Sequence, residues 1–129
     1  MSYLLSFGHH LPDRIVTNPD LEQRTGRDAS TIEKTSGILE RHYAAAETTV
    51  ADLALAAATA CLTNANLTAN DIGLILVSSG SPERTFPGPA SQLAAKLGLT
   101  TTPALDIPVA SAGSLIALTL ANDLQEVPR

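Results

Sequence analysis

The strongest candidate for a reactive site is a short turn at positions 110–113, which carries Ser111. An apolar run at 104–109 leads into this turn, and a long apolar segment with helical spacing, 112–124, follows it. A strand that enters a helix through small residues places one side chain at the helix N-terminus, where free N–H groups and the helix dipole favour negative charge. The pattern therefore predicts a candidate nucleophile at Ser111.

Other reactive side chains fit structural roles better. His9 and His10 are adjacent in a predicted turn, where neighbouring side chains rarely point the same way and no third metal ligand is near. Cys61 falls on the apolar face of a predicted helix, which favours a buried small side chain over a reactive thiol. The neighbouring charges of Glu40 and Arg41 are typical of an ion pair. We therefore predict no metal site.

Composition excludes several classes of function. With 129 residues, the chain is long enough for one domain with a real core. Aromatic residues make up only 3 % and the formal charge is −5, which disfavours nucleic acid as a partner. A single cysteine provides neither a disulfide framework nor a thiolate metal site. Because we find no signal peptide and no apolar run long enough to span a bilayer, we expect a soluble, cytoplasmic protein with no membrane partner.

Alternating apolar and turn-forming segments predict an α/β fold. Strands are expected at residues 3–7, 72–79 and 104–109, and helices at 48–65, 90–97 and 112–124. The strand at 72–79 is apolar at nearly every position, as expected for a central strand covered on both faces. This alternation predicts a layered α/β fold with a largely parallel sheet in a single domain over residues 1–129.

The N-terminal third has weaker signals. Asn18 is predicted as an N-cap with Pro19 at the first helical position, and a second short helix is predicted at 28–34, ending near Gly37. The segment 38–45 has mixed polarity and suits an irregular or hairpin structure.

Two further expectations concern the end of the chain. Asp106, on the strand before Ser111, is predicted to be a structural hydrogen-bonding group, and Pro108 makes that strand irregular. The last helix, 112–124, is apolar on almost every side and requires burial all round. Three strands and about four helices cannot easily enclose it, so we expect further protein, from this chain or a partner, to cover it.

The chain also carries a series of short motifs. They are Leu-Pro at 11–12, Thr-Asn-x-Asp-Leu at 17–21, Gly-Ile-Leu-Glu-Arg-His at 37–42, Asp-Ile-Gly-Leu-Ile at 71–75, Phe-Pro at 86–87 with Gln92, Pro-Ala-Leu-Asp-Ile at 103–107 and Ala-Ser-Ala-Gly at 110–113. In this order and spacing they resemble the N-terminal portion of ketoacyl-acyl-carrier-protein synthase III, in the thiolase superfamily. The resemblance covers essentially the whole chain.

The resemblance implies a partial thiolase-like fold, with α-β-α layers and a mainly parallel sheet, that forms an N-terminal half-domain. In the family, a five-layered α-β-α-β-α fold is normally built from two similar halves, and the protein is normally dimeric. Their usual chemistry is acyl transfer from coenzyme A to a cysteine at a helix N-terminus, followed by decarboxylative condensation with a malonyl-carrier protein. The resemblance therefore implies no permanently bound cofactor, with a coenzyme A or acyl-carrier-protein thioester as the substrate.

The matching positions assign roles to three residues. Ser111 takes the place of the nucleophilic cysteine, and its backbone N–H takes the place of an oxyanion-hole donor. Phe86 lies where the family shapes its acyl pocket across the dimer, although a plain core or interface role fits it equally well. Gly113, in the same turn as Ser111, is assigned to substrate binding.

Three residues depart from the family pattern. A serine hydroxyl has a far higher pKa than a thiol, and a helix dipole alone does not ionise it, so Ser111 requires a general base. The family takes its histidine and asparagine from its second half. Thr31 and Thr35 stand where the family often has a tryptophan that stacks on adenine and an arginine beside it. These substitutions therefore disfavour coenzyme A recognition of the usual kind.

Two hypotheses follow. In the first, the chain is an acyltransferase subunit of fatty acid or polyketide biosynthesis that forms an acyl-Ser111 intermediate. Its partners would be a complementary C-terminal-half subunit or further copies of itself, together with an acyl carrier protein. In the second, it is a non-catalytic, degenerate or truncated homologue with a structural or regulatory role. A serine-hydrolase elbow fits less well, because it requires glycine where Val109 stands.

Overall fold

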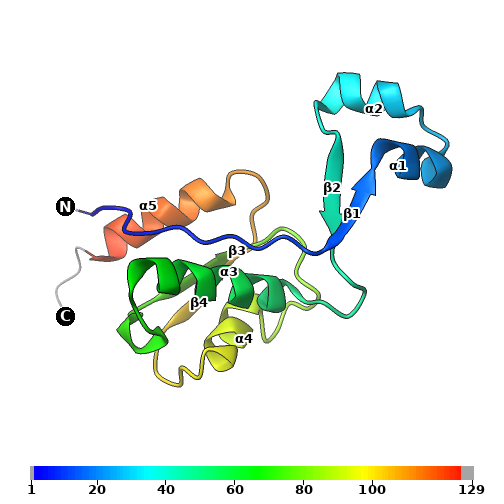
Figure 1. The fold of residues 1–129 in the computed structure, drawn as a ribbon. Coiled ribbons are helices and arrows are strands. Elements are labelled where there is room, and N and C mark those ends of the chain that lie inside the picture. The colour runs from blue at the N-terminus through cyan, green and yellow to red at the C-terminus, as the bar shows by residue number, and fades with distance from the viewer. Residues whose placement is uncertain (1, 126–129) are drawn as a thin grey trace. The chain divides into compact units, whose positions relative to one another are not determined.

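A computed structural model describes residues 2–125 of the chain, which divides into two compact units (Figure 1). One unit is Leu11–Thr48, and the other joins the segment up to His10 to the residues from Thr49 onward. Each unit contains one two-stranded sheet, antiparallel in the first and parallel in the second.

The unit Leu11–Thr48 is a strand pair connected by two short helices. Its elements are β1 (Arg14–Thr17), α1 (Asn18–Thr25), α2 (Ala29–Ser36) and β2 (Glu40–Tyr43). The side chain of Asp28 caps α2, and Gly37 ends it with the left-handed backbone that favours glycine. The short helix predicted at 28–34 is therefore confirmed, and the mixed segment after it contains β2.

The predicted N-cap of α1 was wrong by one residue. Thr17 caps the helix, because its hydroxyl accepts from the Asp20 N–H while the Asp20 carboxylate accepts from the Thr17 N–H. Asn18 is instead buried, and its amide donates to the Ile38 carbonyl at 2.8 Å. Because the Asn18 side chain makes this tertiary hydrogen bond, it does not cap the helix.

The predicted ion pair between Glu40 and Arg41 was also wrong for the described residues. Neighbouring residues of a strand point to opposite faces of the sheet, so the two side chains separate. Arg41 donates to Asn18 Oδ1 at 2.8 Å and to the Val16 carbonyl at 3.3 Å. Arg41 thereby ties β2 to β1 and to the start of α1.

The second unit is a layered α-β-α structure. Its elements are α3 (Val50–Ala65), the 3-10 helix η1 (Ala69–Asp71), β3 (Ile75–Ser78), α4 (Pro89–Lys96), β4 (Ala104–Ile107) and α5 (Gly113–Gln125). Strands β3 and β4 pair in parallel, with α4 in the connection between them. The helices predicted at 48–65, 90–97 and 112–124 and the strands at 72–79 and 104–109 are confirmed, with shorter strands.

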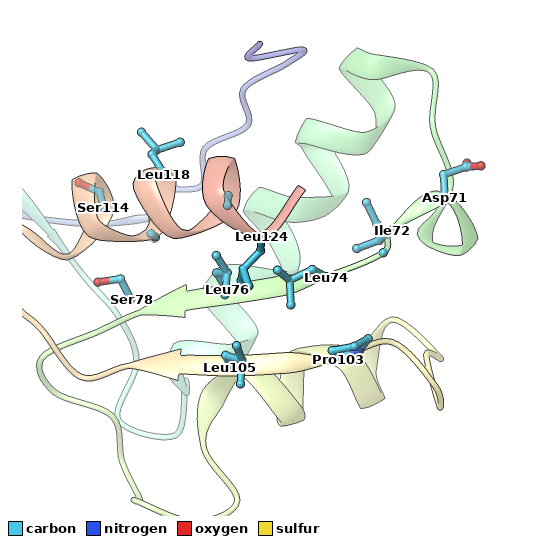
Figure 2. A pocket seen from close by; sticks show the side chains of 13 residues that line it. Asp71, Ile72, Leu74, Leu76, Ser78, Pro103, Leu105, Ser114, Leu118 and Leu124 are labelled. Carbon is cyan, nitrogen blue, oxygen red and sulfur yellow. The ribbon is translucent and has the colours of Figure 1, made fainter. Parts of the chain in front are cut away.

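The core of this unit lies on one face of the sheet. Ile75 and Val77 of β3 pack with Ala90, Leu93 and Ala94 of α4, and residues of α3 complete the cluster. Because side chains alternate along a strand, Leu76 and Ser78 belong to the opposite face, where α5 lies (Figure 2). The sheet is thus covered by α3 and α4 on one side and by α5 on the other.

The strand predicted at residues 3–7 does not form. This apolar segment runs along α3, where Ser6 Oγ donates to the Cys61 carbonyl at 3.0 Å and Asn64 donates to the Phe7 carbonyl at 2.9 Å. A Cβ on Gly8 would overlap the backbone of α3, so glycine permits this close approach. In the described structure the segment contacts a helix rather than the edge of a sheet, and it therefore has no strand ladder.

Asp52 should make the stability of this unit depend on acidity. Hydrogen bonds from Lys96 and then from Thr49 hold the pKa of Asp52 far below its usual value of 3.8. A lowered folded-state pKa gives stabilisation that is fully present above the unfolded pKa and is lost as the pH falls through the folded pKa. We expect Asp52→Asn to weaken the dependence of unfolding on pH in the acidic range below about pH 5.

Chemical unfolding at a series of pH values measures this effect. Asp123→Asn is the control, since within residues 2–125 this exposed carboxylate accepts only from the neighbouring Asn122 amide. Equal pH dependence in the wild type and Asp52→Asn would contradict the prediction.

Candidate functional site

The turn that carries Ser111 connects the end of β4 to the first turn of α5. Ser111 is exposed and has a φ of 56°, in the left-handed region. For a residue other than glycine, this conformation costs about 1–3 kcal/mol and persists only where the surroundings hold it. The Val109 N–H donates to the Ile107 carbonyl at 2.8 Å, and the Ala112 N–H donates to the Ala110 carbonyl at 2.7 Å. The local backbone is thus tightly folded on both sides of Ser111.

The end of β3 lies directly against this turn. Ser78 Oγ donates to the Val109 carbonyl at 3.0 Å. Gly80 packs against Ala110, and Gly113 packs against Ser78 so closely that any side chain at 113 would overlap the Ser78 hydroxyl. Neither Ser78 nor Gly80 was predicted from the sequence to be a site residue. Their place in the sequence was the available signal, because both lie at the carboxyl end of a predicted strand. The carboxyl ends of neighbouring parallel strands meet at one edge of a sheet.

Ser111 stands where an anion would be stabilised. The first helical hydrogen bond runs from the Ile116 N–H to the Ala112 carbonyl, so the N–H groups before it point out of the N-terminus of α5 without helical partners. Within residues 2–125, no hydrogen bond uses the Ser111 N–H. An oxygen that becomes negatively charged beside Ser111 would therefore meet free backbone donors and the positive end of the dipole.

The Ser111 hydroxyl has no general base beside it. No side chain among residues 2–125 forms a hydrogen bond with this hydroxyl. The ring of His42 contacts the Pro12 carbonyl inside the unit Leu11–Thr48, and His9 and His10 are exposed residues outside regular structure. The described residues thus supply a positioned hydroxyl without a group to take its proton.

Phe86 projects from the connection between β3 and α4, with 90 % of its surface exposed. Two hydrogen bonds, each donated by a helix N-terminus to a carboxylate, fix this connection near its two ends. The Glu83 carboxylate accepts from the Val50 N–H of α3, and Asp106 Oδ1 accepts from the Ala90 N–H of α4 at 2.7 Å. The structure thus brings Ser111 and Gly113 into one turn, whereas Phe86 lies on a separate loop.

An apolar groove of about 1260 Å³ opens between the sheet and α5 (Figure 2). Leu74, Leu76 and Leu105 form its floor, and Leu118 and Leu124 of α5 are also among its lining residues, although the Leu118 side chain points away from the sheet. Ser78 and Ser114 lie together at one end. The lining does not include Ser111, Gly113 or Phe86.

Helix α5 contacts the sheet through small residues. Gly113 is buried, and Ala117 and Ala121 are half-buried, at the spacing of one helix face. Its large side chains are exposed, including Leu115 at 67 % and Leu118 at 48 %. The burial on all sides that its sequence requires is therefore not provided by the described residues.

Comparison with known proteins places these features in a family. No model of a protein family matches the chain. It is 41 % identical over 115 residues to a β-ketoacyl-[acyl-carrier-protein] synthase III of Dinoroseobacter shibae, which covers 89 % of this chain and 36 % of that protein. It superimposes on the 3-oxoacyl-[acyl-carrier-protein] synthase III structure from Aquifex aeolicus with a TM-score of 0.89 and 32 % identity, over 95 % of this chain and 39 % of that one.

The chain belongs to the ketoacyl-acyl-carrier-protein synthase III family and corresponds to its N-terminal portion. The fold is accordingly a part of the thiolase-like fold. The chain is also similar to the priming β-ketosynthase of the R1128 polyketide pathway, with a TM-score of 0.86 and 27 % identity over 93 % of this chain and 36 % of that one. It spans little more than a third of the length of these relatives.

Thr31 and Thr35, which the sequence resemblance sets at the expected nucleotide-binding positions, lie on α2 and are exposed. The Thr35 hydroxyl donates to the Thr31 carbonyl at 2.8 Å, and the Thr31 hydroxyl donates to Asp28 at 2.9 Å. Both hydroxyls are thus engaged with their own helix and its cap. Neither side chain offers an aromatic face or a positive charge to a nucleotide.

Two further features are absent from the described part of the chain, a metal-binding cluster and a membrane-spanning helix. No cluster of three or more His, Cys, Asp and Glu side chains in residues 2–125 is arranged to hold a metal ion. None of the described helices combines the length and apolar character needed to cross a membrane.

The hydrogen-bonding role predicted for Asp106 is confirmed, and it leads to a prediction. Gly88, the N-cap of α4, has no side chain to bond the helix N-terminus, so Asp106 does this from β4. We expect Asp106→Ala to lower the free energy of unfolding by about 0.5–2 kcal/mol, as for the loss of a cap. Asp106→Asn, which keeps the accepting oxygen, should lose less. Urea unfolding measures both, and equal losses would contradict this assignment.

Proposed function

We propose that the chain provides the nucleophile and part of the acyl-binding surface of a ketoacyl synthase III-like acyltransferase in fatty acid or polyketide biosynthesis. The observation that carries the proposal is the conformation of Ser111, a non-glycine residue at φ 56° at the N-terminus of α5. The sequence resemblance assigns this position to the family's nucleophile, and backbone strain of this kind clusters at active sites.

The proposed reaction is acyl transfer from a thioester to serine. Ser111 Oγ attacks the thioester carbonyl carbon, and the tetrahedral oxyanion is stabilised by the Ser111 N–H and the dipole of α5. The C–S bond then breaks, and the serine proton leaves with the thiol. The products are an acyl-Ser111 ester and a free thiol of coenzyme A or of an acyl carrier protein.

The proton must pass through a general base that the described residues do not place at Ser111. We propose that this base, a histidine, comes from protein that packs on the apolar groove and on the exposed leucines of α5. A complementary C-terminal-half subunit fits this role, and homo-oligomerisation is the alternative. Burial of Leu115 and Leu118 would supply part of the driving force, since each apolar side chain contributes about 1.5–3 kcal/mol when fully buried.

An acyl carrier protein is the donor that we favour over free coenzyme A. Thr31 and Thr35 remove the aromatic and cationic partners of the nucleotide, whereas a carrier protein delivers its thioester without an adenine to recognise. Phe86 would contribute to the acyl pocket when an additional protein surface covers it, because alone it is almost fully exposed.

Acyl labelling tests the nucleophile. The protein, purified from its own source with any partner, is incubated with radiolabelled acyl-carrier protein, and the label on this chain is counted. We expect Ser111→Ala to reduce labelling by at least about 1,000-fold, because no other oxygen occupies the oxyanion-stabilised position.

Ser91→Ala is the matched control, since Ser91 is an exposed serine in the first turn of a different helix, α4, and lines neither the groove nor the turn of Ser111. It should retain nearly full labelling. Equal labelling of wild type and Ser111→Ala, or no labelling of the wild-type assembly, would overturn the proposal and favour the non-catalytic homologue.

A further inference from the structure

Ser78 lies in direct contact with the turn that carries Ser111. It is the last residue of β3, half-buried, and its register partner on β4 is Ile107. Its hydroxyl donates to the carbonyl of Val109 at 3.0 Å. A side chain from the neighbouring strand therefore holds a carbonyl that lies two residues before Ser111.

The same hydroxyl also lies against the start of α5. A Cβ built on Gly113 would overlap Ser78 Oγ and would lie 3.1 Å from Ser78 Cβ. Gly113 has a negative φ, so its backbone does not require glycine, and the need for glycine comes from this close contact. Ser78 thus contacts both sides of the turn, at Val109 before Ser111 and at Gly113 after it.

A third contact comes from the residues that follow β3. A Cβ built on Gly80 would lie 2.8 Å from the Ala110 Cβ, so the chain after β3 closes against the residue next to Ser111. The end of β3 is therefore the surface against which the turn is folded. A strained φ at Ser111 needs such external support, because the local backbone alone would relax out of it.

We infer that Ser78 is a positioning residue for Ser111, which holds the turn so that residue 111 stays at the N-terminus of α5. This inference rests on the proposed function in taking Ser111 as the nucleophile. Ser78 does not contact the substrate in this role. It acts through the Val109 carbonyl and through its contact with Gly113.

The test replaces Ser111 by cysteine as a probe of its position. A thiol at a helix N-terminus has a lowered pKa, and its reaction with iodoacetamide follows the thiolate. The rate is measured against pH in the intact protein carrying Ser111→Cys. The modified position is identified in the tryptic peptide that begins after Lys96, which contains no other cysteine up to Arg129.

Ser78→Ala, added to Ser111→Cys, should raise the apparent pKa of the introduced thiol by about half a unit or more, because the released turn moves it away from the helix N-terminus. Ser79→Ala is the matched control. It removes a hydroxyl from the next residue, which accepts from the Ser81 N–H at 3.3 Å and is not bonded to the turn. Its profile should match that of Ser111→Cys alone.

A second pair of variants tests the contact with α5. Gly113→Ala should lower the melting temperature, and combining it with Ser78→Gly should recover much of the loss, since the overlapping atoms are then absent. Circular dichroism confirms that every variant keeps its helix content before the profiles are compared.

Coincident alkylation profiles for Ser78→Ala and Ser79→Ala would overturn the inference. Because alkylation uses no acyl donor, this result is independent of acyl labelling. A shifted profile together with unlabelled native protein would overturn the proposed function and leave the positioning role of Ser78 in place.

Discussion

The parallel pairing of β3 with β4 is the constraint on which the candidate site depends. It sets Ser78 opposite Ile107, so that the carboxyl ends of both strands reach the same edge. Only in this register can the Ser78 hydroxyl bond the Val109 carbonyl. A shift by one residue would turn Ser78 toward the core and bring Ile75 and Val77 out of it. The core packing of β3 on α4 therefore also positions the turn of Ser111.

The small and the large side chains of helix α5 lie in different surroundings. Gly113, Ala117 and Ala121 let it approach β3 closely, which places its N-terminus beside Ser78. Its leucines extend on other sides and stay exposed, beside the apolar groove. Apolar side chains that gather on an exposed surface favour contact with further protein. The helix that presents the candidate nucleophile thus also presents the surface that further protein would cover.

Serine at this position changes what the rest of the site must supply. A cysteine at a helix N-terminus can react as a thiolate stabilised by the dipole. The pKa of a serine hydroxyl is too high for that, so positioning and oxyanion stabilisation do not suffice without a base. The described residues provide the first two contributions, through the left-handed Ser111 and the free N–H groups of α5. A general base on the proposed partner surface must therefore accept the proton of the Ser111 hydroxyl.

The helices, the strands β3 and β4, the family and the place of Ser111 before α5 could be predicted from the sequence, because apolar periodicity, capping residues and the order of the motifs are local signals. The sequence was misleading at residues 3–7 and at Asn18, where tertiary contacts override the local sequence pattern. An apolar run becomes a strand only beside another strand, and this one lies along α3. Asn18 caps no helix because Ile38 and Arg41 compete for its side chain. The roles of Ser78 and Gly113 were decided by tertiary structure alone, because they arise from a contact between β3 and α5, which lie far apart in the sequence.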